Sequence, residues 1–243
     1  MKEVYDHQIK IPNNAIKYIL FQRTDYLRFP RTLFYRVLSR LLPFPIYNQV
    51  VAIESRLGVS RVKALYENDM KNEYRAIKDF LPKTCSTVLD IGVGVAGIDV
   101  FINRHYLGQN VNFYLLDKSH VDKNAFYGFN PKGAFYNSLE VAKMMLTENG
   151  IADACVHLIE ATDSNDIKVD ARIDLVISLI SWGFHYPVGT YLEKVHDILS
   201  EDGLVILDVL KGTKGIDELK RKFNKVNVIM ETQSFCRVVA MRK

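Results

Sequence analysis

The spacing of apolar positions along the chain changes at about Pro82. Before it, apolar residues recur at intervals of three and four, which is typical of amphipathic helices and predicts helices over residues 31–42 and 60–80. Five of the seven prolines fall in this part and separate its segments. We therefore predict a helical N-terminal region over residues 1–82, followed by a second domain over residues 83–243.

Beyond Pro82, short runs of β-branched and apolar residues alternate with helical periods. The expected strands cover residues 87–91, 112–116, 154–159, 174–180, 204–208, 225–231 and 235–241, and the expected helices cover 97–105, 137–148 and 190–199. This alternation predicts a mostly parallel sheet with helices on both faces. Only residues 232–234 separate the last two strands, so these strands must pair as an antiparallel hairpin. The predicted fold is α/β, with a Rossmann-like, mostly parallel seven-stranded sheet and a C-terminal antiparallel hairpin.

Composition and charge narrow the classes of function. Hydrophobic residues make up 48% of the chain and charged residues 25%, as in ordinary globular proteins. The net charge is +4, and because a nucleic-acid partner usually requires more positive charge on one face, we expect none. Three widely spaced cysteines form no metal-binding pattern and favour reduced thiols. The sequence has no signal peptide and no apolar run of the roughly 18 residues that span a bilayer, so we expect a cytoplasmic protein.

A glycine-rich turn, Gly92-x-Gly94-x-x-Gly97, follows the first strand and opens a helix. Such a turn lets the backbone lie close to a nucleotide, with the N–H groups of the helix start facing it. The spacing fits a dinucleotide fingerprint, and Asp117 follows at the distance where that fingerprint has an acidic residue. Asp90 favours a different ligand, because a carboxylate beside the turn suits an ammonium-bearing molecule better than a pyrophosphate. A tight turn without any ligand is the structural alternative.

Residues 84–243 resemble the class I S-adenosylmethionine-dependent methyltransferases. The resemblance rests on Asp90-x-Gly92-x-Gly94, on the acidic end of the second strand, and on the helix, turn and strand over residues 191–208. It implies that S-adenosyl-L-methionine is the cofactor and is converted to S-adenosyl-L-homocysteine. The implied cofactor-binding residues are Asp90, Gly92, Gly94, Gly97, Asp117, Lys118, Asp163 and Ser181, with Glu160 as the substitute for Asp163. Asp117 would bind the ribose, and Asp163 the adenine amino group. The family usually has glycine where this chain has Ala96.

The segment 178–187 follows the fourth expected strand and should project into the ligand crevice at the carboxyl edge of the sheet. We assign His185 there as the catalytic base, since an imidazole accepts a proton at neutral pH. Trp182 and Tyr186 could stack on a flat acceptor. The alternative is that His185 only forms a hydrogen bond with a loop and that Trp182 packs in the hydrophobic core. The sequence of this segment is similar to that of sugar O-methyltransferases of polysaccharide biosynthesis. This similarity implies that the methyl group is transferred to a hydroxyl of a small, sugar-like acceptor.

The long connection over residues 118–135 is rich in aromatic residues and is expected to form a lid or acceptor wall. Tyr136 and Asn137 open the next helix beside the same crevice and are candidate acceptor residues, although Asn137 could equally be a helix N-cap. We expect no catalytic metal, and Asp208, at the end of the fifth strand, is the residue that could contribute to one.

Three functions follow as hypotheses. The first is methyl transfer from S-adenosylmethionine to a small-molecule or carbohydrate hydroxyl. The second is an NAD-dependent oxidoreductase, and the third is a non-catalytic cofactor-binding protein of a glycan-assembly complex. The basic, amphipathic residues 31–42 predict weak contact with a membrane surface. A homodimer is among the expected assemblies.

Overall fold

The structure is a computed structural model that describes residues 8–28, 47–119 and 137–242. The helix expected over residues 31–42, most of the aromatic connection over 118–135, and Tyr136 lie outside these residues. Among the described helices, none is long and apolar enough to cross a membrane.

A seven-stranded sheet forms the centre of the fold, with the order β3-β2-β1-β4-β6-β8-β7. The strands are β1 (Thr87–Ile91), β2 (Asn112–Asp117), β3 (Val156–Glu160), β4 (Ile173–Ser178), β6 (Leu199–Leu210), β7 (Lys225–Glu231) and β8 (Phe235–Met241). The first five of these pair in parallel, whereas β8 pairs antiparallel with both β6 and β7. The predicted Rossmann-like sheet with its C-terminal antiparallel hairpin is therefore confirmed.

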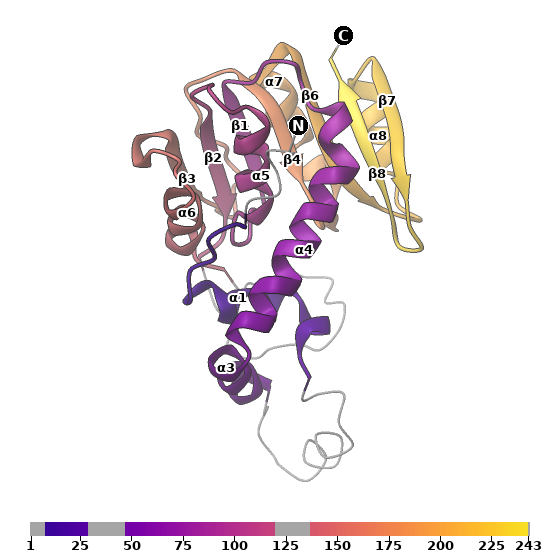
Figure 1. The fold of residues 1–243 in the computed structure, drawn as a ribbon. Helices are drawn as coiled ribbons and strands as arrows, with labels where there is room; N and C mark the ends of the chain where they lie inside the picture. Colours follow the sequence, from indigo (N-terminus) through magenta and orange to yellow (C-terminus); the bar gives the residue numbers. More distant parts are fainter. Residues whose placement is uncertain (1–7, 29–46, 120–136, 243) are drawn as a thin grey trace.

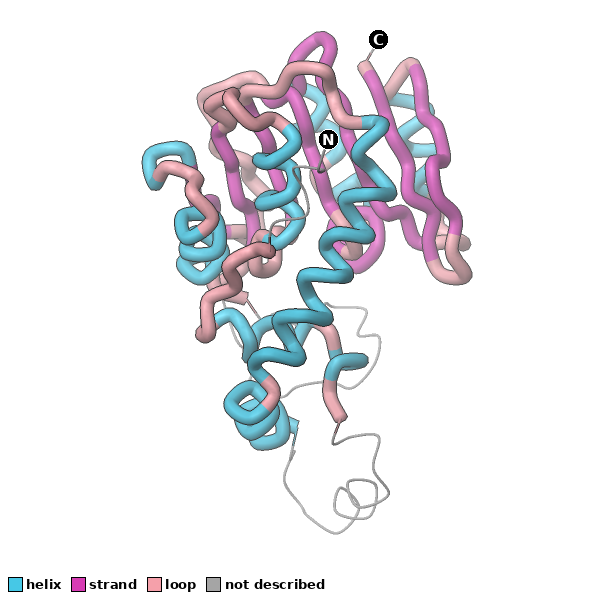
Figure 2. The backbone as a smooth tube through the Cα atoms, in the orientation of Figure 1, coloured by secondary structure: helices cyan, strands magenta, loops and turns pink. Residues whose placement is uncertain are grey.

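Helices cover both faces of this sheet (Figure 2). One face packs against α4 (Val59–Ile77), α5 (Gly97–His105) and α6 (Leu139–Glu148), and the other against α7 (Leu192–Ile198) and α8 (Gly215–Lys222). Neighbouring strand residues alternate between the two layers: Val88 joins the first hydrophobic core and Leu89 the second. Buried apolar side chains on both faces explain why the strand sequences are continuous apolar runs rather than alternating ones.

The N-terminal region shares a hydrophobic core with the sheet. Its helices are α1 (Ala15–Gln22), α3 (Tyr47–Leu57) and α4. In Figure 1, α4 runs diagonally across one face of the sheet, while α1 and α3 lie beyond the edge where β1 and β2 end. Val62, Met70 and Ile77 of α4 are buried in the same core as the inward side chains of β1 and β4. A domain boundary near Pro82 stays a prediction.

A buried ion triad also joins α4 to the sheet. Arg237 of β8 is fully buried and donates from Nε to Asp208 Oδ1 at 2.7 Å and from Nη2 to Asp208 Oδ2 at 2.9 Å. Its third nitrogen, Nη1, donates to Glu73 of α4. The triad therefore ties α4 to the side of the sheet where β6 and β8 pair.

Within residues 83–243, one α-helix and one strand were not predicted from the sequence. Helix α8 is eight residues long and has Ile216 and Leu219 as its apolar side chains, so the recurrence of apolar positions alone did not reveal it. The extended segment β5 (Ser181–Tyr186) follows β4 and was expected to be a projecting segment. It packs beside β6 instead, because Gly183 has a φ of 88° and no side chain: a Cβ there would lie 2.7 Å from the Asp208 carbonyl oxygen.

Candidate functional site

The turn between β1 and α5 is built around three residues with left-handed backbone angles. Gly92, Gly94 and Ala96 have φ values of 78°, 58° and 59°. A Cβ on Gly92 would overlap the Ser181 hydroxyl, so glycine is required there and Ser181 lies directly against the turn. Ala96 precedes α5 and adopts the conformation that glycine favours, at the position where the resembled family usually has glycine.

Two side chains from the N-terminal region lie against this turn. A Cβ on Gly94 would be 2.9 Å from Gln22 Oε1, at the end of α1. A Cβ on Gly97 would overlap the phenol of Tyr66, whose oxygen accepts a hydrogen bond from the Gly97 N–H. Sequence reasoning missed both Gln22 and Tyr66, because they reach the turn only through the packing of α1 and α4. The N-terminal region therefore contacts the turn at Gly94 and Gly97, and Ser181 contacts it at Gly92.

Asp117 ends β2 beside the turn, because Ile91 of β1 pairs with Leu116. Its Oδ2 accepts hydrogen bonds from the Gly94 N–H at 2.9 Å and from Asn137 Nδ2 at 2.8 Å. Its Oδ1 accepts from the Lys118 N–H at 2.7 Å. Burial raises the pKa of Asp117 to about 6 in spite of these three donors. These three hydrogen bonds hold the Asp117 carboxylate next to the turn.

Asn137 is a partner of Asp117 and not a helix N-cap. The residue at the N-cap of α6 is Ser138, and the Asn137 side chain is 5% exposed and turned toward Asp117. Its Oδ1 meets no donor among the described residues. The N-cap alternative from the sequence is therefore wrong.

The two candidates for the adenine contact lie at and beyond the end of β3. Glu160 pairs with Asp117 in the sheet, and its carboxylate accepts from the Ser119 N–H at 2.7 Å. Asp163 is exposed in the turn that follows. Glu160 is therefore the carboxylate that stands next to Asp117, while Asp163 is farther along the chain on the surface.

A buried pair of carboxyl groups lies behind the turn. Asp90 of β1 is 3% exposed, and Asp99, in the first turn of α5, is fully buried. Burial and the mutual repulsion of the two groups raise the pKa of Asp90, and burial raises that of Asp99. Sequence reasoning selected Asp90 and missed Asp99. The sequence pattern that could have revealed Asp99 is its position among Ile98, Val100 and Phe101, which are buried residues of α5.

His185 and Tyr186 are half-buried at the end of β5. The His185 ring packs edge-to-face on Phe184, with ring centroids 5.0 Å apart. Burial lowers the pKa of His185, so the imidazole is neutral at neutral pH. Ser181, at the other end of β5, touches the glycine turn, so this strand runs from that turn to the histidine.

Trp182 belongs to the core, contrary to the expectation that it stacks on an acceptor. Its side chain is fully buried, Nε1 donates to the Val188 carbonyl at 2.8 Å, and the ring packs edge-to-face on Tyr191. The largest apolar side chain of the segment is stabilised by burial and by a partner for its N–H. Trp182 therefore presents no free face to a ligand.

The fold and this site can be compared with known proteins. No protein-family model matches the sequence, and no curated protein matches it. Among solved structures, the 16S rRNA N2 G1207 methyltransferase of T. Thermophilus, in complex with AdoMet and guanosine, aligns with a TM-score of 0.50 and 13% identity over 72% of this chain and 43% of that one. The precorrin-6y C5,15-methyltransferase of Geobacter metallireducens GS-15 aligns with a TM-score of 0.50 and 16% identity over 73% of this chain and 89% of that one. The chain has the fold of these methyltransferases. It spans less than half the length of the first of them.

In this methyltransferase fold, Asp208 is not placed to hold a metal. Both of its carboxylate oxygens accept hydrogen bonds from Arg237, and its side chain is fully buried. The backbone N–H of Ile180 also donates to Asp208. The one candidate metal residue of the sequence is therefore engaged in the buried ion triad.

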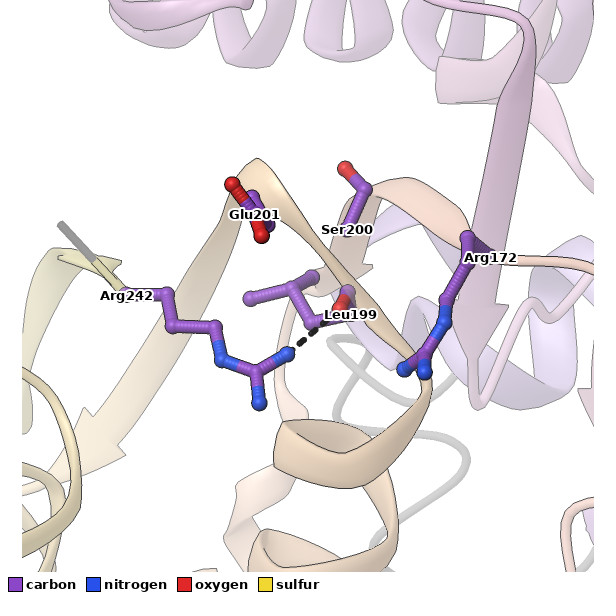
Figure 3. Close-up of a pocket in the computed structure, with 5 residues that line it drawn as sticks. All are labelled: Arg172, Leu199, Ser200, Glu201 and Arg242. Atoms are coloured by element: carbon purple, nitrogen blue, oxygen red, sulfur yellow. Dashed lines mark hydrogen bonds between the residues drawn. The ribbon is translucent and has the colours of Figure 1, made fainter.

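A cavity of about 510 Å³ lies at the opposite edge of the sheet (Figure 3). Arg172, Leu199, Ser200, Glu201 and Arg242 line it. The two arginines donate to backbone carbonyls, Arg172 to Asp197 and Arg242 to Leu199 at 2.9 Å, and so cap the end of α7. Ligands of open α/β sheets bind at the carboxyl ends of the strands, so this cavity is not the candidate site.

Proposed function

We propose that this chain is an S-adenosylmethionine-dependent methyltransferase. The observation that carries the proposal is the juxtaposition of the Gly92–Gly97 turn, the buried Asp90 and the Asp117 carboxylate at the ends of adjacent strands. Asp117 can accept hydrogen bonds from a ribose diol. Asp90 and Asp99 place two carboxyl groups beside the turn, and such groups suit a cofactor that carries an ammonium and a sulfonium group. A pyrophosphate in the same place would face two carboxyl groups, which disfavours NAD.

The residues present fit the cofactor in the following way. Asp117 and Asn137 would hold the ribose, the backbone of Gly92 and Gly94 would lie beneath the methionine part, and Ser181 would flank it. When bound, the cofactor supplies an electrophilic methyl group on sulfur. The protein contributes mainly position, by holding an acceptor in line with that group and keeping water out.

We expect calorimetry to separate the cofactor hypotheses. S-adenosylhomocysteine should bind the protein, and NAD should not bind at the same concentration, because NAD carries no ammonium group for Asp90. Displacement of bound S-adenosylhomocysteine by S-adenosylmethionine would confirm a shared site. Binding of NAD alone would overturn the proposal and favour an oxidoreductase, whereas cofactor binding without turnover on any acceptor would favour a non-catalytic role.

The acceptor is proposed to be a hydroxyl of a small, sugar-like molecule, with His185 as the base. A neutral imidazole is able to take the hydroxyl proton, and the lowered pKa of His185 keeps it neutral. The mild net charge of +4 supports a small or carbohydrate acceptor over a nucleic acid. Incubation of candidate sugars, nucleotide sugars and RNA fragments with the cofactor, read as a mass gain of ~14 Da for one added CH₂, would identify the acceptor class.

We expect His185→Gln to lower kcat on the true acceptor by about 100-fold or more, because general-base catalysis contributes about 10²–10⁴-fold. Cofactor affinity should change little. His157→Gln is the matched control: this histidine is also half-buried, but it stacks on Tyr114 within β2 and β3, with ring centroids 4.5 Å apart. Full turnover by His185→Gln, measured by S-adenosylhomocysteine release, would remove His185 from the mechanism.

A further inference from the structure

Asp99 lacks the partners that buried carboxylates normally have. Both of its oxygens are buried, and among the described residues its own backbone N–H and the Asp90 carboxyl are the hydrogen-bonding groups that act on it. The group that faces Asp99 is the carboxyl of Asp90. Two carboxylates are both acceptors, so they can form a hydrogen bond only through a proton held between them.

The surroundings favour such a shared proton. Asp117 on β2 and Tyr66 on α4 also face the pair, and Asp117 adds to the negative charge around Asp90. Burial raises the pKa of Tyr66, so its phenol is neutral. A cation among the described residues near the pair is Arg23, which follows α1 and acts on Tyr66. Side-by-side carboxyl groups in a buried site release their two protons in separate steps, because the second charge is opposed by the first.

We propose that Asp99 is a positioning residue for the methyl donor: it shares one proton with Asp90, and the ammonium group of the donor, on binding against Asp90, displaces that proton to solvent. This inference rests on the proposed function. The step balances in charge and atoms, since one carboxylic O–H bond breaks, the proton goes to water, and the ammonium keeps all its protons. The N–H groups of the ammonium then donate to Asp90 in place of the shared proton.

The proposal makes donor binding depend on pH in a stated direction. Below the pKa at which the pair loses its shared proton, binding must expel that proton, so affinity should fall as the pH falls, by up to about tenfold per pH unit. Above that pKa the pair is already ionised, and affinity should level off. Burial raises the pKa of both groups, and that of Asp90 further than that of Asp99, so the shared proton stays on the pair through neutral pH and affinity should still rise between pH 7 and 8.

The experiment compares two ligands by calorimetry at pH 7.5, where Asp99 has ionised and the shared proton remains, in buffers with different enthalpies of ionisation. S-adenosylhomocysteine carries an amino-acid end with the ammonium and a carboxylate, and 5′-methylthioadenosine carries the same adenosine and sulfur without that end. With the full-length wild-type protein, S-adenosylhomocysteine should release close to one proton, and methylthioadenosine should release markedly less. The difference isolates the ammonium end of the site, because both ligands carry the ribose that Asp117 is proposed to bind.

Asp99→Asn provides the matched variant. An asparagine donates to Asp90 without a transferable proton, so the variant should release no additional proton with S-adenosylhomocysteine, and its affinity should stay flat between pH 6 and 8. Equal proton release by the variant and the wild type, or equal release with both ligands, would overturn the role of Asp99. Failure of S-adenosylhomocysteine to bind the wild type at all would instead overturn the proposed function, and this inference with it.

Discussion

Replacing Arg237 by alanine should lower the free energy of unfolding by about 3–5 kcal/mol, as expected when one partner of a buried ion pair is removed. Arg237 and Asp208 are both fully buried, and the guanidinium satisfies both Asp208 oxygens. Without it, the Asp208 carboxylate is left in the core with the Ile180 N–H as its remaining donor from the described residues. The measurement is urea unfolding followed by the fluorescence of Trp182, the only tryptophan and a fully buried one.

Two further variants test the reason for this loss. Arg237→Met combined with Asp208→Leu removes both charges and should recover much of the stability, because apolar residues can replace a buried ion pair at little cost. Lys222→Ala breaks a pair with Glu193, whose side chain is 70% exposed, and should cost less than about 1 kcal/mol. A loss below about 1 kcal/mol for Arg237→Ala would show that water reaches the triad, and the explanation by burial of an unpaired charge would then be wrong.

The triad also links stability to the candidate site. Glu73 and Tyr66 lie on the same helix, α4, and Tyr66 contacts the glycine turn at Gly97. Loosening the end of α4 that holds Glu73 should therefore also disturb the cover over the turn. Helices α1 and α4 therefore contribute to the candidate site, because Gln22 and Tyr66 contact the glycine turn of the Rossmann-like part.

The sheet could be predicted from the sequence because its signals are local. The apolar run of β1 and the short link between β7 and β8 each determine their own structure within a few residues. Helix α8 was not predicted because it is short and has two apolar side chains, which is too few for a repeated apolar spacing to be recognised. The strand β5 was not predicted because its position beside β6 depends on a close approach of Gly183 to Asp208. These two residues are far apart in the sequence.

The same distinction applies to the candidate site. Asp90, Gly92 and Asp117 follow from strand ends and turn geometry, which adjacent residues encode. Gln22 and Tyr66 reach the turn through packing between distant segments, and no pattern near them signals it. Trp182 was assigned to an acceptor because it stood in an unusual loop sequence, but burial of its large ring outweighed that position.

Asp117→Ala should weaken binding of S-adenosylhomocysteine by about 100-fold or more. The change removes the proposed ribose acceptor, and it leaves the N–H groups of Gly94 and Lys118 and the Asn137 amide without their partner. These three losses lower stability in the free and the bound protein alike, whereas the ribose hydroxyls would lose their acceptor only on binding. An unsatisfied buried donor costs about 1–3 kcal/mol, and about 2.7 kcal/mol corresponds to a 100-fold change in Kd. Glu231→Ala is the matched control, because it removes an exposed carboxylate at the end of β7, and calorimetry at pH 8 is the measurement.

The pH dependence of Asp117 distinguishes a direct ribose contact from a structural role. Its pKa of about 6 means that the carboxylate form, which accepts both hydroxyl hydrogens, is lost as the pH falls through 6. Affinity for 5′-methylthioadenosine, which lacks the ammonium group, should therefore decline below pH 6 in the wild type. Asp117→Asn, which cannot ionise, should bind it more weakly at pH 8 and with no such decline. If Asp117→Asn bound it as tightly as the wild type at pH 8, Asp117 would serve only to hold the Gly94 backbone, and the ribose would have to be bound by another residue.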